Sequence, residues 1–174
     1  MFNEEFVTET PTTDSKSLVG RNLEVNVSEL LRQPQKYYMK LLFKIDRVDD
    51  KARTAYTRFN GFSVSREHVY RVVRKRIQKV ELISDVETKD NWKLQVSTVT
   101  ILNRNTDAEV QKKVRNHVGE MLAKEAGETD IDDFIKLVVN SVLQMKIKKS
   151  ATKIYPVRFS EITKIEVVNA PKAS

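Results

Sequence analysis

Residues 78–102, QKVELISDVETKDNWKLQVSTVTIL, decide the fold class of this 174-residue chain. The first half repeats apolar residues with the two-residue period of a half-buried strand, at Val80, Leu82 and Val86. After a polar step at Lys89-Asp90-Asn91, the segment from Val96 to Leu102 is apolar on both faces, which is typical of a more buried strand. Two such segments joined by a short polar turn predict an antiparallel hairpin.

A second hairpin is predicted nearer the N-terminus. Residues 36–46 alternate, with apolar side chains on one face at Tyr37, Met39, Leu41, Phe43 and Ile45. A polar turn at 49–52 leads into a returning strand, RTAYTRF, which we expect Gly61 to break. Before this hairpin, residues 22–27 predict a short strand, and residues 28–31 predict a turn of helix.

Helical periodicity appears between and after the hairpins. Ser65 is placed to cap a helix over 66–76, and Thr106 with Glu109 forms a capping box for a helix that should stop at Gly127. Another helix is predicted from Ile131 to Met145, followed by a basic linker, KIKKSATK, and a last strand over 157–168. Adjacent antiparallel pairs with inserted helices predict an α+β fold, with a mainly antiparallel sheet closing into a barrel-like core flanked by about three helices.

The charge of the chain indicates a polyanionic partner. It holds 31 Lys and Arg against 24 Asp and Glu, a net charge of +7. Residues 1–19 have one lysine against four acidic residues, so we expect an acidic, flexible arm there, and a single RNA-binding domain of net charge +10 over residues 20–174. The absence of cysteine excludes disulfides, thiol nucleophiles and thiolate zinc sites. Apolar runs of at most three residues exclude a membrane span and predict a cytoplasmic protein.

Two clusters of basic residues are the candidate RNA-binding sites. The first has a single acid, Glu67, among six cations: Arg66, Arg71, Arg74, Lys75, Arg76 and Lys79. The second has no acid between Met145 and Ser160, and its members are Lys146, Lys148, Lys149, Lys153 and Arg158. Exposed faces usually mix the two signs of charge, so these clusters favour phosphate contact over a plain solvated surface. Tyr70 and Tyr155 could stack on bases, although Tyr155 beside Pro156 could equally anchor a core.

Signals for catalysis are weak, and we predict neither a catalytic residue nor a metal or cofactor. The four glycines are too scattered for a phosphate-binding loop. His68 and His117 each stand alone on a predicted helix, so we expect both to be surface or partly hydrogen-bonded histidines. Asp85, Glu87 and Lys89 form a D-x-E-x-K pattern that could serve a magnesium-dependent nuclease. Charges flanking a hairpin turn explain that pattern more simply.

Four blocks, taken in order, resemble the S3Ae family of small-subunit ribosomal proteins, also written eS1. They are Val19-Gly20-Arg21, TRFNGFSVSREHVYRVVRKR, DVETKDNWKLQV and IYPVRFSEITKIEVV, and the resemblance spans residues 20–168. It implies a structural constituent of the small ribosomal subunit that binds ribosomal RNA, has no enzymatic activity, and lies near the platform and the messenger-RNA exit. It also implies neighbouring ribosomal proteins as partners, with messenger RNA or initiation factors as further candidates.

The resemblance has two departures. Family members begin with a basic arm containing Lys and Trp, which this sequence lacks ahead of Met1. Either the true start lies upstream, or this protein has lost an RNA-contacting arm. The chain also ends at Ser174 without the long extension of eukaryotic members, which favours the archaeal type. A free-standing RNA chaperone is an alternative function for the same basic surfaces.

Overall fold

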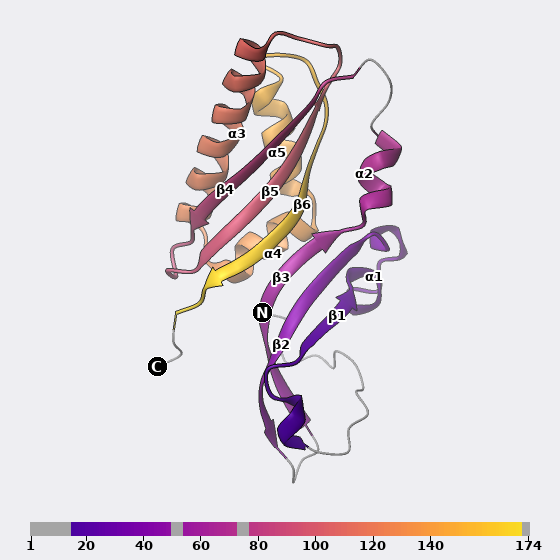
Figure 1. The fold of residues 1–174 in the computed structure, drawn as a ribbon, viewed down its shortest axis with the longest axis vertical. Coiled ribbons are helices and arrows are strands. Elements are labelled where there is room, and N and C mark those ends of the chain that lie inside the picture. The colour runs from indigo at the N-terminus through magenta and orange to yellow at the C-terminus, as the bar shows by residue number, and fades with distance from the viewer. Residues whose placement is uncertain (1–14, 50–53, 73–76, 172–174) are drawn as a thin grey trace. The chain divides into compact units, whose positions relative to one another are not determined.

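The computed structural model describes residues 15–49, 54–72 and 77–171. These residues belong to two compact units, the first ending at Ser63 and the second beginning at Val64. Figure 1 labels the helices and strands of both. The predicted arm over residues 1–19 falls mostly outside the described residues, and the single domain over residues 20–174 stays a prediction.

The first unit is built on three strands. β1 (Asn22–Asn26) pairs antiparallel with β2 (Met39–Asp49). On its other side, β2 neighbours β3 (Thr54–Val64) in the sheet. Short helical turns fill the connections: η1 (Ser15–Leu18), α1 (Val27–Leu30) and η2 (Pro34–Lys36). The predicted apolar face of β2 is confirmed, because four alternate residues are buried: Met39, Leu41, Phe43 and Ile45.

Two predictions for this unit are wrong. Tyr37 lies before β2, not within it, and is 60% exposed. Pro34 begins a short helical turn, so the strand begins only at Met39. Gly61 does not end β3. The strand continues through it to Val64, because Phe62 and Val64 are buried and their packing outweighs the weak strand propensity of glycine.

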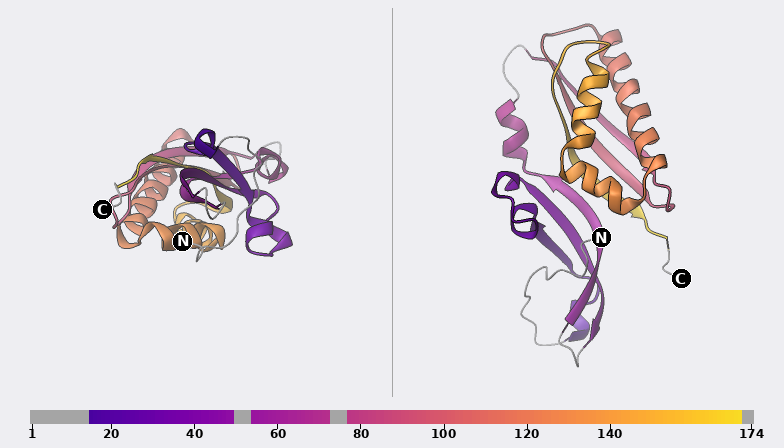
Figure 2. Two further views of the ribbon diagram at one scale, coloured as in Figure 1. Left: turned by 90° about the horizontal axis from the view of Figure 1, so that it is seen from below. Right: turned by 180° about the vertical axis from the view of Figure 1, so that it is seen from behind.

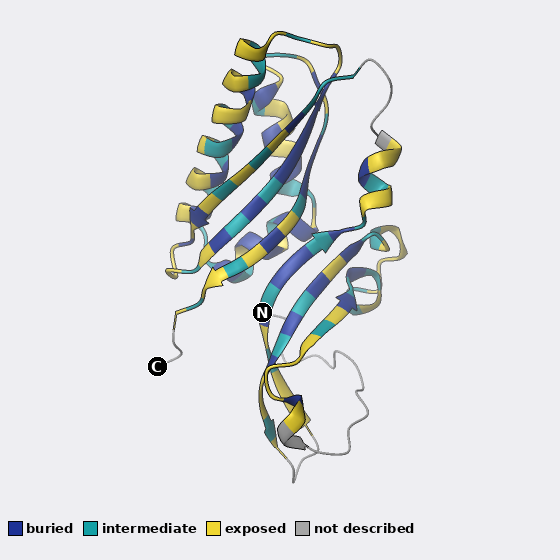
Figure 3. Ribbon diagram, in the orientation of Figure 1, coloured by how far each residue is buried: buried dark blue, intermediate teal, exposed yellow. Residues whose placement is uncertain are grey.

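The second unit contains the predicted central hairpin. β4 (Lys79–Glu87) and β5 (Lys93–Leu102) pair antiparallel, and Asn91 takes the left-handed conformation in the turn between them. β5 also pairs with β6 (Val157–Asn169), the predicted last strand. Three helices, α3 (Ala108–Glu128), α4 (Ile131–Val139) and α5 (Val142–Ala151), cover one face of this β4-β5-β6 set, as Figures 1 and 2 show from opposite sides. Figure 3 shows β5 as the most continuously buried of the three strands.

The helices of the second unit differ from their predictions at the ends. α2 (Arg66–Val72) is present, and residues 73–76 of its predicted continuation lie outside the described residues. The residue at the N-cap position of α3 (Ala108–Glu128) is Asp107, and its side chain makes no capping hydrogen bond, so the predicted Thr106–Glu109 capping box is wrong. Glu109 instead pairs with Lys113 one turn later, at 2.7 Å. α3 passes Gly127 and ends at Glu128, where Thr129 bonds back to the Glu125 carbonyl.

The helix predicted over 131–145 is two helices, α4 (Ile131–Val139) and α5 (Val142–Ala151). Ser141 separates them with a left-handed φ of 58°, a conformation that interrupts a right-handed helix. The prediction of a basic linker over 146–153 is therefore wrong for most of its length. α5 runs through it because Ile147 and Ala151 continue the buried face begun by Leu143.

The α+β class and the antiparallel pairing are confirmed, whereas closure into a barrel is wrong. Among the described strands, β1 and β4 are edge strands, each hydrogen-bonded to a single neighbour. Arg115 of α3 donates to the Glu81 carbonyl of β4 at 3.1 Å, so this edge is partly covered by a side chain. The described residues form five α-helices where about three were predicted, and none of these helices is long and apolar enough to cross a lipid bilayer.

Candidate nucleic-acid interface

α5 presents a basic surface opposite its buried face. Its core side is made by Leu143, Gln144, Ile147 and Ala151, all buried. Lys148 and Lys149 are exposed on the other sides of the helix, and Lys153 and Arg158 are exposed in the chain that follows it. We call these four cations, Lys148, Lys149, Lys153 and Arg158, the α5 basic surface. Within the described part of the chain, no hydrogen bond or ion pair engages their side chains.

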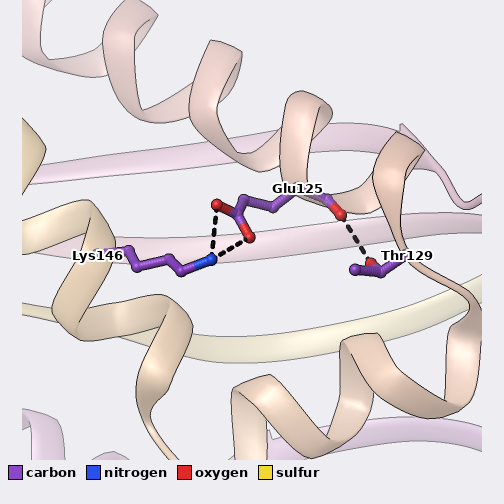
Figure 4. Close-up of polar contacts among 3 residues, drawn as sticks. All are labelled: Glu125, Thr129 and Lys146. Carbon is purple, nitrogen blue, oxygen red and sulfur yellow. Dashed lines mark hydrogen bonds and ion pairs between the residues drawn. The ribbon is translucent and has the colours of Figure 1, made fainter.

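The fifth predicted cation of this cluster, Lys146, has a different role. Its Nζ lies 2.7 and 2.9 Å from the two carboxylate oxygens of Glu125 on α3 (Figure 4). The Glu125 carbonyl also accepts a hydrogen bond from Thr129 Oγ1 at 2.7 Å, at the end of α3. Lys146 therefore joins α5 to α3, and its charge is already balanced by a carboxylate that is only 15% exposed.

Polar side chains fix α5 against its neighbours. Gln144 Nε2 donates to the Val138 carbonyl at 3.0 Å and to Glu161 Oε1 of β6 at 3.2 Å, which ties α5 to both α4 and β6. His117 of α3 and Ser150 of α5 share a hydrogen bond. This contact confirms the prediction of a partly hydrogen-bonded histidine at position 117. Lysines on a helix held in this way project from a rigid support.

The Glu161 carboxyl is the most strongly perturbed acid among the described residues. Burial raises its pKa from an ordinary value near 4.5 to about 7, against the opposing effect of the hydrogen bond from Gln144. Gln144 Oε1 is itself buried and has no hydrogen-bond partner in the described parts of the chain. Sequence reasoning missed this pair. The available signal was an acid at the centre of the last strand, directly before the buried Ile162.

The first predicted cluster is only partly described. Arg66 and Arg71 are exposed on α2, whereas Arg74, Lys75 and Arg76 lie outside the described residues. Lys79 is on β4 and pairs with Glu81. The structure therefore separates the ends of this cluster between a helix and a strand. RNA contact by these residues stays a prediction.

α2 is positioned by its own small contact with β6. Val69 is buried, and the half-buried His68 ring lies 6.2 Å from the Phe159 ring. Desolvation, followed by the charge of Arg71, lowers the pKa of His68, so the ring is neutral near pH 7. The half-buried ring agrees with the prediction of a surface or partly hydrogen-bonded histidine at position 68.

The two tyrosines proposed for base stacking differ in exposure. Tyr70 is 64% exposed on α2, so its ring is open to a partner. Tyr155 is half-buried and its backbone N–H bonds to the Ala151 carbonyl, at the end of α5. Both stacking roles stay predictions.

The D-x-E-x-K pattern does not form a metal site in the part of the chain that the structure describes. Asp85 and Glu87 share one side of β4, as predicted, and both are exposed. Asp85 accepts a hydrogen bond from Gln95 Nε2 at 3.1 Å. No group of three or more acidic or histidine side chains among the described residues is arranged to hold a metal ion.

Comparison with known proteins identifies the family. The model of the ribosomal S3Ae family matches residues 1–171. The small ribosomal subunit protein eS1 of Methanobrevibacter smithii is 34% identical over 168 residues, covering 97% of this chain and 86% of that protein. The eS1 proteins of Methanopyrus kandleri and Archaeoglobus fulgidus are 31% and 34% identical, and the matches cover 82% and 77% of their lengths. The chain thus belongs to the ribosomal S3Ae family, a family of structural proteins and not of enzymes.

Proposed function

We propose that the chain is a ribosomal-RNA-binding constituent of the small ribosomal subunit, located on cytoplasmic ribosomes, and that the α5 basic surface contacts the RNA. The observation that carries this proposal is the group of four exposed cations with no partner among the described residues. Membership of the S3Ae family supports the ribosomal role. The same family relation supports a position near the platform and the messenger-RNA exit, beside other small-subunit proteins and within reach of messenger RNA or initiation factors.

The physical basis is neutralisation of phosphate charge. Each lysine or arginine that meets a phosphate releases condensed counterions, so affinity depends steeply on salt concentration. Lys148, Lys149 and Lys153 can contribute fully to this effect, because no acidic side chain among the described residues neutralises them. Lys146 should contribute less, because Glu125 holds its ammonium group. Contacts of this kind position a protein on RNA without reading its sequence.

The test replaces the three lysines together, in Lys148→Gln, Lys149→Gln and Lys153→Gln. Binding to full-length small-subunit ribosomal RNA is measured by filter retention across a series of salt concentrations. We expect weaker binding and a slope of log K against log[salt] that is shallower by about 2 to 3, because about 0.7 to 0.9 is lost for each phosphate contact. Thermal unfolding should barely change, since all three side chains are exposed.

A matched control removes the same charge elsewhere on the second unit, in Arg104→Gln, Lys112→Gln and Lys124→Gln. These side chains are also exposed and have no partner among the described residues. The control should keep the slope of the unmodified protein. Equal losses in both variants would show that only overall charge matters, and an unchanged slope in the α5 variant would place the RNA on another surface.

A further inference from the structure

β4 is an edge strand of the β4-β5-β6 set, and one side of it is exposed. In β4 the even-numbered side chains point to the helices: a Cβ atom on Gly119 of α3 would lie 3.6 Å from Leu82, and Val80 and Val86 are buried. The β4–β5 register has no bulge, so the odd-numbered side chains point the other way. All four from Glu81 to Glu87 are exposed. We call Glu81, Ile83, Asp85 and Glu87 the outer β4 face.

The outer β4 face combines an exposed apolar side chain with carboxylates. Ile83 is 66% exposed, and its cross-strand partner is Ser97, which is too small to cover it. Glu81 is paired with Lys79, Asp85 accepts a hydrogen bond from Gln95, and Glu87 lies across from Lys93 in the register. Within the described residues, neither Asp85 nor Glu87 has an ion pair. Three of the four outward positions on β4 carry a carboxylate, although the whole chain has a net charge of +7. This side of β4 therefore differs in charge from the α5 basic surface.

This combination is less favourable for RNA than for a cationic protein segment. Phosphates would be repelled by Asp85 and Glu87, whereas lysine or arginine side chains would be attracted to them. Ile83 would supply the apolar contact that simple charge pairing lacks, since exposed ion pairs alone contribute little. We propose that the outer β4 face is the docking site for a lysine- and arginine-bearing segment of a neighbouring protein in the small subunit. This inference rests on the proposed function, since it needs the chain to be part of that subunit.

The absence of cysteine makes a direct test possible. In Ile83→Cys the new thiol is the only one in the chain, and its alkylation by a maleimide is timed in the free protein and in purified small subunits. We expect at least tenfold slower alkylation in the subunit. A cross-linker with one maleimide and one amine-reactive end should join this thiol to a lysine in a basic segment of another protein, identified by mass spectrometry.

Charge variants in the Ile83→Cys background test the role of the carboxylates. Adding Asp85→Lys and Glu87→Lys should reduce the protection to less than twofold and abolish the cross-link. Adding Glu120→Lys and Glu128→Lys, which changes the charge equally at exposed positions on α3, should preserve both. Equal rates of alkylation in free and assembled protein would overturn the proposal. Protection without a lysine cross-link would do so too, as would a cross-link to a second copy of this chain or protection that survives the Asp85 and Glu87 changes.

The outcome is separable from that of the proposed function. Cross-linking is done on subunits that already contain the chain, whereas RNA contact by α5 is measured with the lysine variants on isolated RNA. A fully reactive thiol at position 83 in an assembled subunit would remove the docking site and leave the α5 proposal intact. An unchanged salt slope in the lysine variants would do the reverse.

Discussion

Glu161 has an ionisable side chain that is almost completely buried. It is 5% exposed and, among the residues that the structure describes, accepts one hydrogen bond, from Gln144, whereas Gln144 Oε1 receives none. An ionised carboxylate at this position would be a buried charge met by a single hydrogen bond, so burial favours the protonated acid and raises its pKa.

The predicted consequence is a loss of stability as pH rises. The pKa of Glu161 is about 7 in the folded protein against about 4.5 as its ordinary value, so the folded state binds the proton more tightly than the unfolded state does. Its stabilising contribution is complete below about pH 4.5 and is lost as pH rises through 7. Glu161→Gln mimics the protonated acid. It should match the unmodified protein at pH 4.5 and exceed its free energy of unfolding at pH 8 by on the order of 3 kcal/mol, measured by urea denaturation.

Glu166→Gln is the control for this experiment. Glu166 is exposed on the same strand and pairs with Lys164 at the surface, so its removal should leave the fall in stability between pH 4.5 and pH 8 in place. If Glu161→Gln showed the same fall as the unmodified protein, Glu161 would be ionised in the folded state and the assigned pKa would be wrong.

Single-residue environments were the hardest feature to predict from sequence. Lys146 and Lys149 have the same residue type in the same basic run, yet one is neutralised by Glu125 and the other has no partner among the described residues. The difference depends on α3 lying beside α5, which brings together residues 21 positions apart in the sequence. Tyr37 shows the opposite case, since its place in an alternating pattern predicted burial and the helical turn at Pro34 left it exposed.

At the scale of elements, the two-residue period was a reliable guide and helix ends were not. β4, β5 and β6 lie where the alternation predicts them, because a strand with one buried face must repeat every two residues. The break between α4 and α5 carries no proline or glycine and arises from a left-handed Ser141, supported by the bond from Gln144 to Val138. Such a break depends on tertiary contacts, so local sequence shows a single helix.

α3 offers a test of how closely the helices pack on the sheet. Gly119 lies in the middle of this helix, where glycine costs about 0.5 to 1 kcal/mol relative to alanine. A methyl group there would meet Leu82 of β4 at 3.6 Å, an ordinary contact distance. We expect Gly119→Ala to raise the free energy of unfolding by about 0.5 to 1 kcal/mol in urea denaturation at an unchanged m value. A decrease would show that α3 lies closer to β4 than the structure has it.

At the scale of the whole molecule, the α+β class could be predicted from the sequence, but whether the sheet closes into a barrel could not. Antiparallel hairpins separated by helices specify α+β packing, because each hairpin needs a layer to cover its apolar face. Whether the edge strands meet to form a barrel depends on twist and register summed over all strands, which no local pattern contains. β1 and β4 each keep one hydrogen-bonded neighbour among the described strands, so the set stays open.

The sequence shows where the basic residues are concentrated, but it does not show how their side chains are arranged in space. The run from Lys146 to Lys153 was predicted as a linker, and most of it is a helix whose buried side is anchored by Gln144 and Ile147. A helix fixes the spacing of its cations, which a flexible linker would not. This rigid presentation supports the choice of α5, over the partly described cluster at α2, as the primary surface for RNA.

The most direct test of the central claim is sedimentation of a cell lysate through sucrose gradients at moderate and high salt, following the tagged chain. The account predicts co-migration with the small subunit at moderate salt and release at high salt, because counterion-dependent contacts weaken as salt rises. The Lys148, Lys149 and Lys153 triple variant should be released at a lower salt concentration than the Arg104, Lys112 and Lys124 control. A protein that stays at the top of the gradient in both conditions would contradict the assignment to the small ribosomal subunit.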